Sequence, residues 1–204
     1  MALPKVKPGG EFTYADYLTW PEDERWELID GVAYAMSPAP TNSHQLIVGN
    51  LFARLHAHFK GKPCRPFVAP FDVRLPKAGL ADQEVDTVLQ PDITVVCAAE
   101  KLKDNRGCLG TPDWVIEVVS PSTALRDQKL KRAVYERHRV PEYWLVHPTD
   151  RCVTIYRLGP QGYGQPLIHG LGECCAPEAF PDLVIEVADI FADLPPIDDA
   201  ASFY

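Results

Sequence analysis

The chain has 204 residues, of which 46% are hydrophobic and 24% charged, so it can bury one well-formed core and is typical of a globular domain. Its net charge of −8 argues against a protein held on nucleic acid by general positive charge. No apolar run approaches the ~20 residues needed to cross a bilayer, and the first residues do not resemble a signal peptide, so we expect a cytoplasmic protein without membrane contact.

The first part of the chain predicts a flexible arm followed by a short helix, a hairpin and a longer helix. Residues 1–10 are rich in proline, glycine and lysine and are expected to form a flexible arm, with a single domain over residues 11–204. A short helix is predicted over residues 12–18, capped by Thr13. A hairpin follows over residues 25–37, because the pair Asp30-Gly31 supplies the positive φ of a tight turn. A core-facing helix should run from Asn42 or Ser43 to about Phe59, since apolar residues recur there at helical spacing.

The remaining segments predict a mixed sheet. Strand-like runs cover residues 64–75, 92–97, 114–119, 143–146 and 153–157, with a polar loop at 77–86 and a final segment at 183–187. A basic helix should begin at Ser122 or Thr123 and end before Val140-Pro141. Strands interrupted by two helices indicate an α/β or α+β layer with a central mixed sheet. The six cysteines show no paired spacing, so we expect neither a zinc site nor structural disulfides.

Two carboxylates stand beside runs of β-branched residues. Asp92 precedes Ile-Thr-Val-Val, and Glu117 lies within Trp-Val-Ile-Glu-Val-Val. Burying a carboxylate costs free energy unless a cation or hydrogen bonds compensate the charge. Two buried carboxylates on neighbouring strands would therefore favour binding of a divalent metal. In that case at least one of their pKa values should rise without the metal. The alternatives are a residue that merely follows the strand-entry proline, for Asp92, and a strand residue pointing to solvent, for Glu117.

The basic helix carries a lysine that could reach these acids. Lys131 lies one helical turn from Asp127 and one from Tyr135, so the three share a face. The alternative is a surface lysine paired with Asp127, which would contribute only ~0.3 to 0.5 kcal/mol. The other basic residues between positions 126 and 139 could form a solvated helix face or a phosphate-contacting surface.

These segments together resemble the Uma family of restriction-endonuclease-like proteins, within the PD-(D/E)xK nuclease superfamily. The resemblance rests on Trp26-Glu27-Leu28-Ile29-Asp30-Gly31, His44, Gln90-Pro91-Asp92, Glu117 with Ser120-Pro121-Ser122, Asp127 with Lys131 and Tyr135, and residues 140–146. It implies a restriction-endonuclease-like fold, a central mixed β-sheet flanked by helices. In the superfamily pattern a lysine lies two residues after the second acid, where this chain has Val119. The resemblance therefore implies a migrated lysine, with Lys131 the candidate and Lys129 the spare.

The resemblance also implies a site and an activity. Asp92, Glu117 and the Val118 carbonyl would bind Mg²⁺ or Mn²⁺, Lys131 would stabilise the phosphate, and Glu27 would join the acidic cluster. The chain would then be a metal-dependent endonuclease with DNA as substrate, and we expect Lys131→Met to abolish cleavage while leaving folding nearly intact. For His44, the simpler interpretation is a residue at the helix N-terminus that has no catalytic or binding role.

Two other functions stay open at this point. The chain could be a catalytically inactive nucleic-acid-binding or scaffold protein that retains the nuclease fold, as Val119 and the acidic net charge suggest. It could also be a transposon- or toxin-associated partner protein. A homodimer is expected in any case, because the apolar C-terminal segment would be hard for a monomer to cover. That segment carries Phe191, Ile197, Phe203 and Tyr204.

Overall fold

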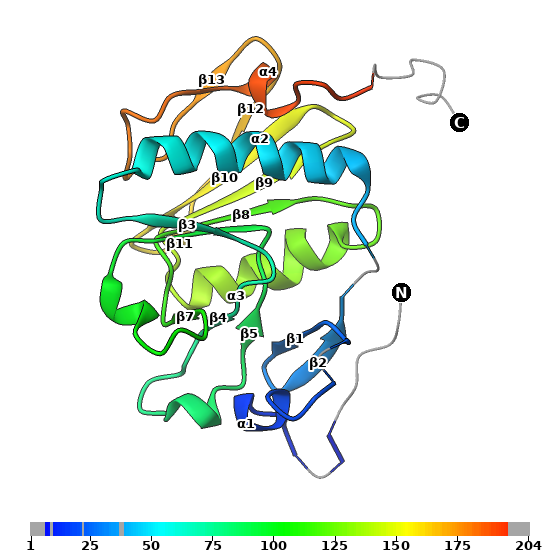
Figure 1. Cartoon of the computed structure of the whole chain (residues 1–204), viewed down its shortest axis with the longest axis vertical. Helices are drawn as coiled ribbons and strands as arrows, with labels where there is room; N and C mark the ends of the chain where they lie inside the picture. Colours follow the sequence, from blue (N-terminus) through cyan, green and yellow to red (C-terminus); the bar gives the residue numbers. More distant parts are fainter. Residues whose placement is uncertain (1–6, 9, 22, 37–38, 196–204) are drawn as a thin grey trace.

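A mixed sheet with a helix on each face forms the centre of the protein, as Figure 1 shows for this computed structural model. The structure describes residues 7–8, 10–21, 23–36 and 39–195. Within these residues the central sheet has the strand order β11-β10-β9-β8-β6-β3, and β12 also pairs with β10. Its strands are β3 (Arg65–Val68), β6 (Ile93–Val96), β8 (Trp114–Val118), β9 (Glu142–His147), β10 (Cys152–Gly159), β11 (Gly162–Tyr163) and β12 (Leu167–His169). The predicted α/β (α+β) class with a central mixed sheet is confirmed.

A second, smaller sheet lies beside the first and carries the N-terminal hairpin. Its strand order is β2-β1-β5-β4-β7, formed by β1 (Trp26–Ile29), β2 (Val32–Ala35), β4 (Val73–Arg74), β5 (Val88–Leu89) and β7 (Cys108–Leu109). A further pair joins β13 (Cys174–Cys175) and β14 (Ile185–Glu186). The helices are α1 (Tyr14–Tyr17), α2 (Asn42–Phe59), the π-helical turn η3 (Arg126–Lys131), α3 (Arg132–Arg137) and α4 (Val187–Ile190), with short 3₁₀ turns η1 (Asp82–Glu84) and η2 (Ala99–Leu102).

Alternation along β8 divides the core between the two helices. Trp114 and Ile116 pack with α2 in one apolar cluster, whereas Val115 packs in another with α3. The residues of α2 buried against the sheet include Ile47 and Leu51, both fully buried, and each contributes about 1.5–3 kcal/mol by leaving water. Because side chains alternate along a strand, Glu117 points to the same face as Val115, toward α3. This places an ionisable group beneath the helix that carries Lys131.

The predicted hairpin and first helices are confirmed, with one change at a cap. Asp30 and Gly31 have φ values of 47° and 72°, as a tight two-residue hairpin turn requires. The N-cap of α2 is Thr41 rather than Asn42 or Ser43, and its hydroxyl accepts a hydrogen bond from the His44 N–H. Asn42 is already helical, because Thr41 has the extended backbone that a cap residue adopts.

The predicted strand over residues 64–75 is wrong as a single element. It consists of β3 and β4, which belong to different sheets, and Pro70 lies between them. Proline has no N–H to donate to a sheet, so the chain can leave one ladder there and join another. The two-residue strand β5 was not predicted, because its apolar run is too short to show a period.

Cys64 and Cys97 form a disulfide, which corrects the expectation that the cysteines stay unpaired. Strands β3 and β6 are antiparallel with Arg65 opposite Val96, so the next pair in this register is Cys64 and Cys97. Their sequence separation of 33 residues gives no sign of this contact, since only the register creates it.

The C-terminal segment only partly falls within the described residues. Phe191 is 3% exposed and packs in the apolar cluster of α2, so it is covered by its own chain. Ile197, Phe203 and Tyr204 lie outside the described residues, as does most of the predicted arm over residues 1–10. In the described part of the chain, no helix combines the length and apolarity needed to span a membrane.

Candidate functional site

The strand register brings the two predicted acids to one end of the central sheet. Strands β6 and β8 pair antiparallel with Ile93 opposite Ile116, so one further step sets Asp92 opposite Glu117. Cross-strand partners in an antiparallel pair lie on the same face, with Cβ atoms about 4.5–5.5 Å apart. The expectation that these acids stand on adjacent strands is confirmed.

Lys131 reaches this end of the sheet from the crossover between β8 and β9. These two strands are parallel, so the intervening helix must return across the sheet, and η3 lies over the end of β8. The Nζ atom of Lys131 lies 2.8 Å from Glu117 Oε1, 2.8 Å from Glu27 Oε1 and 3.7 Å from Asp127 Oδ1. The predicted helix is π-helical at this point, a form that occurs frequently at functional sites.

The cluster is buried, which excludes the surface-residue alternatives. Glu117 is 4% exposed, Lys131 4%, Asp127 2% and Glu27 1%. The hydroxyl of Tyr135, also fully buried, donates a hydrogen bond to Glu117 Oε1 at 3.2 Å. Glu117 therefore does not point to solvent, and Lys131 is more than a surface partner of Asp127.

Glu27 comes from the smaller sheet and is occupied by donors from its own protein. Its Oε1 atom accepts the Gln90 N–H at 3.1 Å besides contacting Lys131, and its Oε2 atom accepts from Arg126 at 3.4 Å. Both oxygens are thus engaged. In this geometry Glu27 holds Lys131 in place, and it presents no free oxygen to a metal.

Asp92 and Glu117 each keep one oxygen available. Asp92 Oδ2 accepts the Val118 N–H at 2.8 Å and lies 3.1 Å from His44 Nε2. Asp92 Oδ1 and Glu117 Oε2 receive no hydrogen bond from any described residue. The N–H and C=O of one strand residue point to the same edge, so the Val118 carbonyl also faces the Asp92 side.

Burial and charge perturb the titration of the cluster. Burial raises the pKa of Glu117 well above its ordinary value, Lys131 opposes this, and Asp127, Asp92 and Glu27 add to it. Burial likewise raises the pKa of Asp127 against the opposing charge of Lys131. For Lys131, burial lowers the pKa, but the three carboxylates around it outweigh burial and raise it well above its ordinary value. The predicted rise for at least one acid is confirmed in direction.

The whole cluster lies within a stretch that matches a known family. A family model named Uma2, with the description "Putative restriction endonuclease", matches residues 14–188. The chain belongs to the Uma2 family. A solved structure titled as a "putative nuclease belonging to DUF820" from Anabaena variabilis ATCC 29413 has the same fold, with a TM-score of 0.70 and 21% identity. The match covers 88% of this chain and 97% of that chain. The comparison with curated proteins finds no match.

The donor set of the Uma2 chain fits a divalent metal of the Mg²⁺ type. Among the described residues, no group of three or more His, Cys, Asp or Glu side chains is arranged to hold a metal. Mg²⁺ does not require one, since it is usually bound by one or two carboxylates and keeps several waters. Asp92, Glu117 and the Val118 carbonyl meet that requirement. With all carboxyl groups ionised, the four carboxylates of the cluster, opposed by Lys131 and Arg126, leave two negative charges, the charge that a divalent cation balances.

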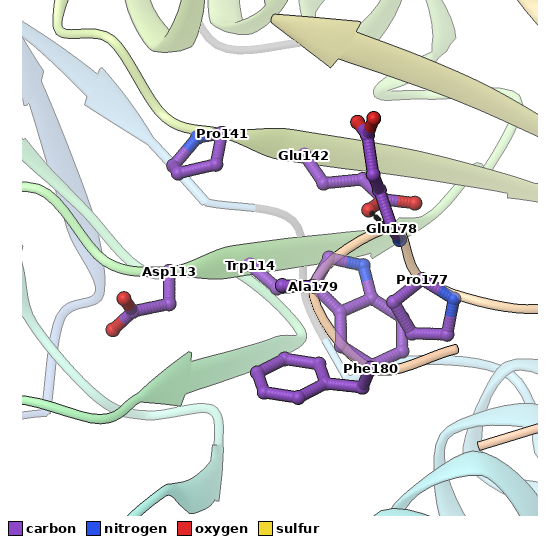
Figure 2. A pocket seen from close by; sticks show the side chains of 8 residues that line it. All are labelled: Asp113, Trp114, Pro141, Glu142, Pro177, Glu178, Ala179 and Phe180. Carbon is purple, nitrogen blue, oxygen red and sulfur yellow. Dashed lines mark hydrogen bonds between the residues drawn. The ribbon is translucent and has the colours of Figure 1, made fainter. Parts of the chain in front are cut away.

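A separate pocket lies at the opposite end of β8 and β9. Figure 2 shows the rings of Trp114 and Phe180 and the carboxylates of Glu142 and Glu178 around a pocket of about 160 Å³. Trp114 and Glu142 begin their strands, whereas Glu117 lies near the end of β8. Glu142 accepts hydrogen bonds from the Trp144 indole and the Glu178 N–H, so both of its oxygens are occupied. This pocket is not part of the carboxylate cluster.

Two parts of the Uma2 site were not foreseen in the sequence. His44 was expected to have no task beyond the helix cap, yet its ring contacts Asp92. The Gln90 side chain joins Asp72, Tyr17 and Arg25 in a polar network, while its N–H binds Glu27. The Gln-Pro-Asp sequence marked this position, but it did not indicate these partners.

The basic helix does not form one continuous cationic face. Arg126 and Lys131 are buried in the cluster, and Arg137 pairs with Asp30 at 2.7 Å. Arg132 lies 4.0 Å from Glu136 and over the ring of Tyr156. The predicted basic residues therefore divide between the site and separate surface contacts.

Proposed function

We propose that this Uma2 protein is a metal-dependent DNA endonuclease that hydrolyses phosphodiester bonds. The observation that carries the proposal is the pair of cross-strand carboxylates, Asp92 and Glu117, beside the buried ammonium of Lys131; each carboxylate has one oxygen without a donor among the described residues. The family description supports a nuclease, and the metal and the DNA substrate are our additions.

Each residue of the cluster has a distinct part in this proposal. Asp92, Glu117 and the Val118 carbonyl would hold Mg²⁺ or Mn²⁺. Such an ion, when bound, polarises the phosphate and lowers the pKa of a water. Lys131 supplies a fixed positive charge for the negative charge that develops on the phosphate oxygens. Glu27 helps to position Lys131 through the contact of its Oε1 atom, while its Oε2 atom accepts a hydrogen bond from Arg126.

Metal binding and cleavage can be tested together on matched variants. Mn²⁺ titration by calorimetry should give micromolar to millimolar affinity for the parent and lose most of it in Asp92→Ala and Glu117→Ala. Parent protein should nick plasmid DNA with Mg²⁺ or Mn²⁺, and EDTA should stop it. Lys131→Met should abolish nicking, whereas Lys129→Met is the control, because Lys129 is exposed. Unchanged Mn²⁺ binding in both carboxylate variants would refute the proposed site.

The second candidate is a nucleic-acid-binding or scaffold protein without activity. Val119 stands where the superfamily has its lysine, and its side chain packs against the apolar cluster of α3 instead of the carboxylates. Lys131 also already neutralises part of the acidic charge. If the parent binds Mn²⁺ and DNA but cleaves neither single- nor double-stranded substrate, this candidate is favoured.

The homodimer and the cytoplasmic location also belong to the proposal. With Phe191 buried in its own chain, the dimer would rest on the tail beyond residue 195, and sedimentation of the chain with and without this tail tests it. A disulfide such as Cys64–Cys97 is rare in the cytosol, so thiol trapping in intact cells tests the location. A fully oxidised pair in cells would count against a cytoplasmic protein.

A further inference from the structure

We infer that His44 is a positioning residue that sets the orientation of the Asp92 carboxylate. The inference rests on the proposed metal site, and it concerns a residue outside the set of metal-holding and phosphate-binding groups. It begins with the contact of His44 Nε2 and Asp92 Oδ2 at 3.1 Å. Within the described residues, His44 is the basic side chain that lies within ion-pair distance of Asp92.

The hydrogen-bond roles in this contact follow from the chemistry of the two groups. An ionised carboxylate can only accept, so the Nε2 atom of His44 must carry the proton. Asp92 Oδ2 then accepts twice, from His44 and from the Val118 N–H. Two donors on one oxygen fix the plane of the carboxylate. Asp92 Oδ1 then has no donor among the described residues.

Asp92 needs such support because the strand ladder holds its backbone but not the plane of its carboxylate. The residue lies one position before β6 and after Pro91, and its carbonyl accepts the Ala69 N–H at 3.1 Å. Its side chain is 19% exposed, and the side chain of His44 is 15% exposed, so this is the more open edge of an otherwise buried cluster. A single backbone donor would let the carboxylate turn about its bond to Cβ.

The position of His44 is itself fixed by the docking of α2. His44 lies three and seven residues before Ile47 and Leu51, so the three share the helix face that packs on the sheet. The Thr41 hydroxyl holds the first turn through the His44 N–H at 3.3 Å. Helix packing therefore places the imidazole over the strand end.

The test compares three variants with the parent in Mn²⁺ titration and in plasmid nicking. His44→Ala removes the donor and should weaken Mn²⁺ binding about tenfold or more, as loss of a group that orients a metal ligand typically does. His44→Gln places an amide N–H at a similar distance from the backbone and should restore affinity to within about threefold of the parent. His56→Ala is the control, since His56 is exposed on the same helix, and its affinity should equal that of the parent.

Two results with the His44 variants would overturn the inference. Parent-like Mn²⁺ affinity in His44→Ala would show that Asp92 needs no support, and equal loss in the Ala and Gln variants would show that the hydrogen bond is irrelevant. If His44→Ala fails to fold, the tautomer of His44 in the metal-free parent tests the inference instead. NMR should show a proton on Nε2, and a proton on Nδ1 alone would refute the proposed role. A parent that binds Mn²⁺ without cleaving DNA contradicts the proposed function alone, whereas a parent that binds no Mn²⁺ overturns both.

Discussion

Replacing Lys131 by methionine should destabilise the protein strongly at neutral pH and weakly at pH 5. The ammonium contacts the buried carboxylates of Glu117 and Glu27, which are 4% and 1% exposed. Glu27 keeps Arg126 and the Gln90 N–H in the variant, so Glu117 is the nearest group left without a cation, followed by Asp127 at 3.7 Å. Removing one partner of a buried pair typically costs about 3–5 kcal/mol.

The pH dependence gives an independent value for the same cost. Without Lys131, Glu117 avoids a buried charge by binding a proton, which costs about 1.4 kcal/mol per pH unit above an unfolded pKa of about 4.3. The cost to stability is therefore about 4 kcal/mol at pH 7 and about 1 kcal/mol at pH 5. Lys131 lowers the pKa of Glu117 in the parent, so its removal raises that pKa further. The folded variant then binds more protons than its unfolded state, and its stability relative to the parent falls as pH rises.

Urea denaturation at pH 5 and pH 7, followed by tryptophan fluorescence, measures both values. Lys129→Met is the matched control and should stay within about 0.5 kcal/mol of the parent at either pH, because its side chain is on the surface. A loss for Lys131→Met of equal size at both pH values would contradict the assignment to Glu117. No loss at all would refute the buried ion pair. The sequence alone suggested that Lys131→Met leaves folding nearly intact. From the buried ion pairs we instead expect this variant to lose stability at pH 7.

Three further predictions concern the metal, the disulfide and a loop. Burial raises the pKa of Glu117, and a metal binds the deprotonated carboxylate, so Mn²⁺ affinity should fall as pH is lowered. Calorimetry in two buffers of different ionisation enthalpy should detect the proton released on binding. Cys64→Ser opens a link across 33 residues and should lower the free energy of unfolding by about 2–4 kcal/mol, a loss that reductant should reproduce in the parent. Gly107→Ala should cost about 3 kcal/mol in urea denaturation, because φ is +98° and a Cβ would collide with the Asp72 carbonyl oxygen. Gly79→Ala, at φ +85° but in open space, should cost only about 1–2 kcal/mol, and equal losses would contradict the collision.

Elements whose signals are local could be predicted from the amino-acid sequence alone. The pair Asp30-Gly31 predicted the hairpin turn, and the apolar spacing from residue 46 to 55 predicted α2. These succeed because turn conformation and helix amphipathicity depend on residues within a few positions of one another. The acids Asp92 and Glu117 were also recognisable, since a charged group beside a run of buried β-branched residues contradicts the pattern around it.

Which of these groups contact one another depends on the packing of the whole chain. His44 and Asp92 are 48 residues apart, and Glu27 and Arg126 are 99 residues apart. Their contacts depend on where α2 docks and on how the smaller sheet lies beside the larger one, which is set by the burial of whole faces. The same holds for Cys64 and Cys97, which a shift of one residue in the β3–β6 register would separate. Local sequence does not specify strand register or helix docking, because both follow from the packing of side chains contributed by the entire chain.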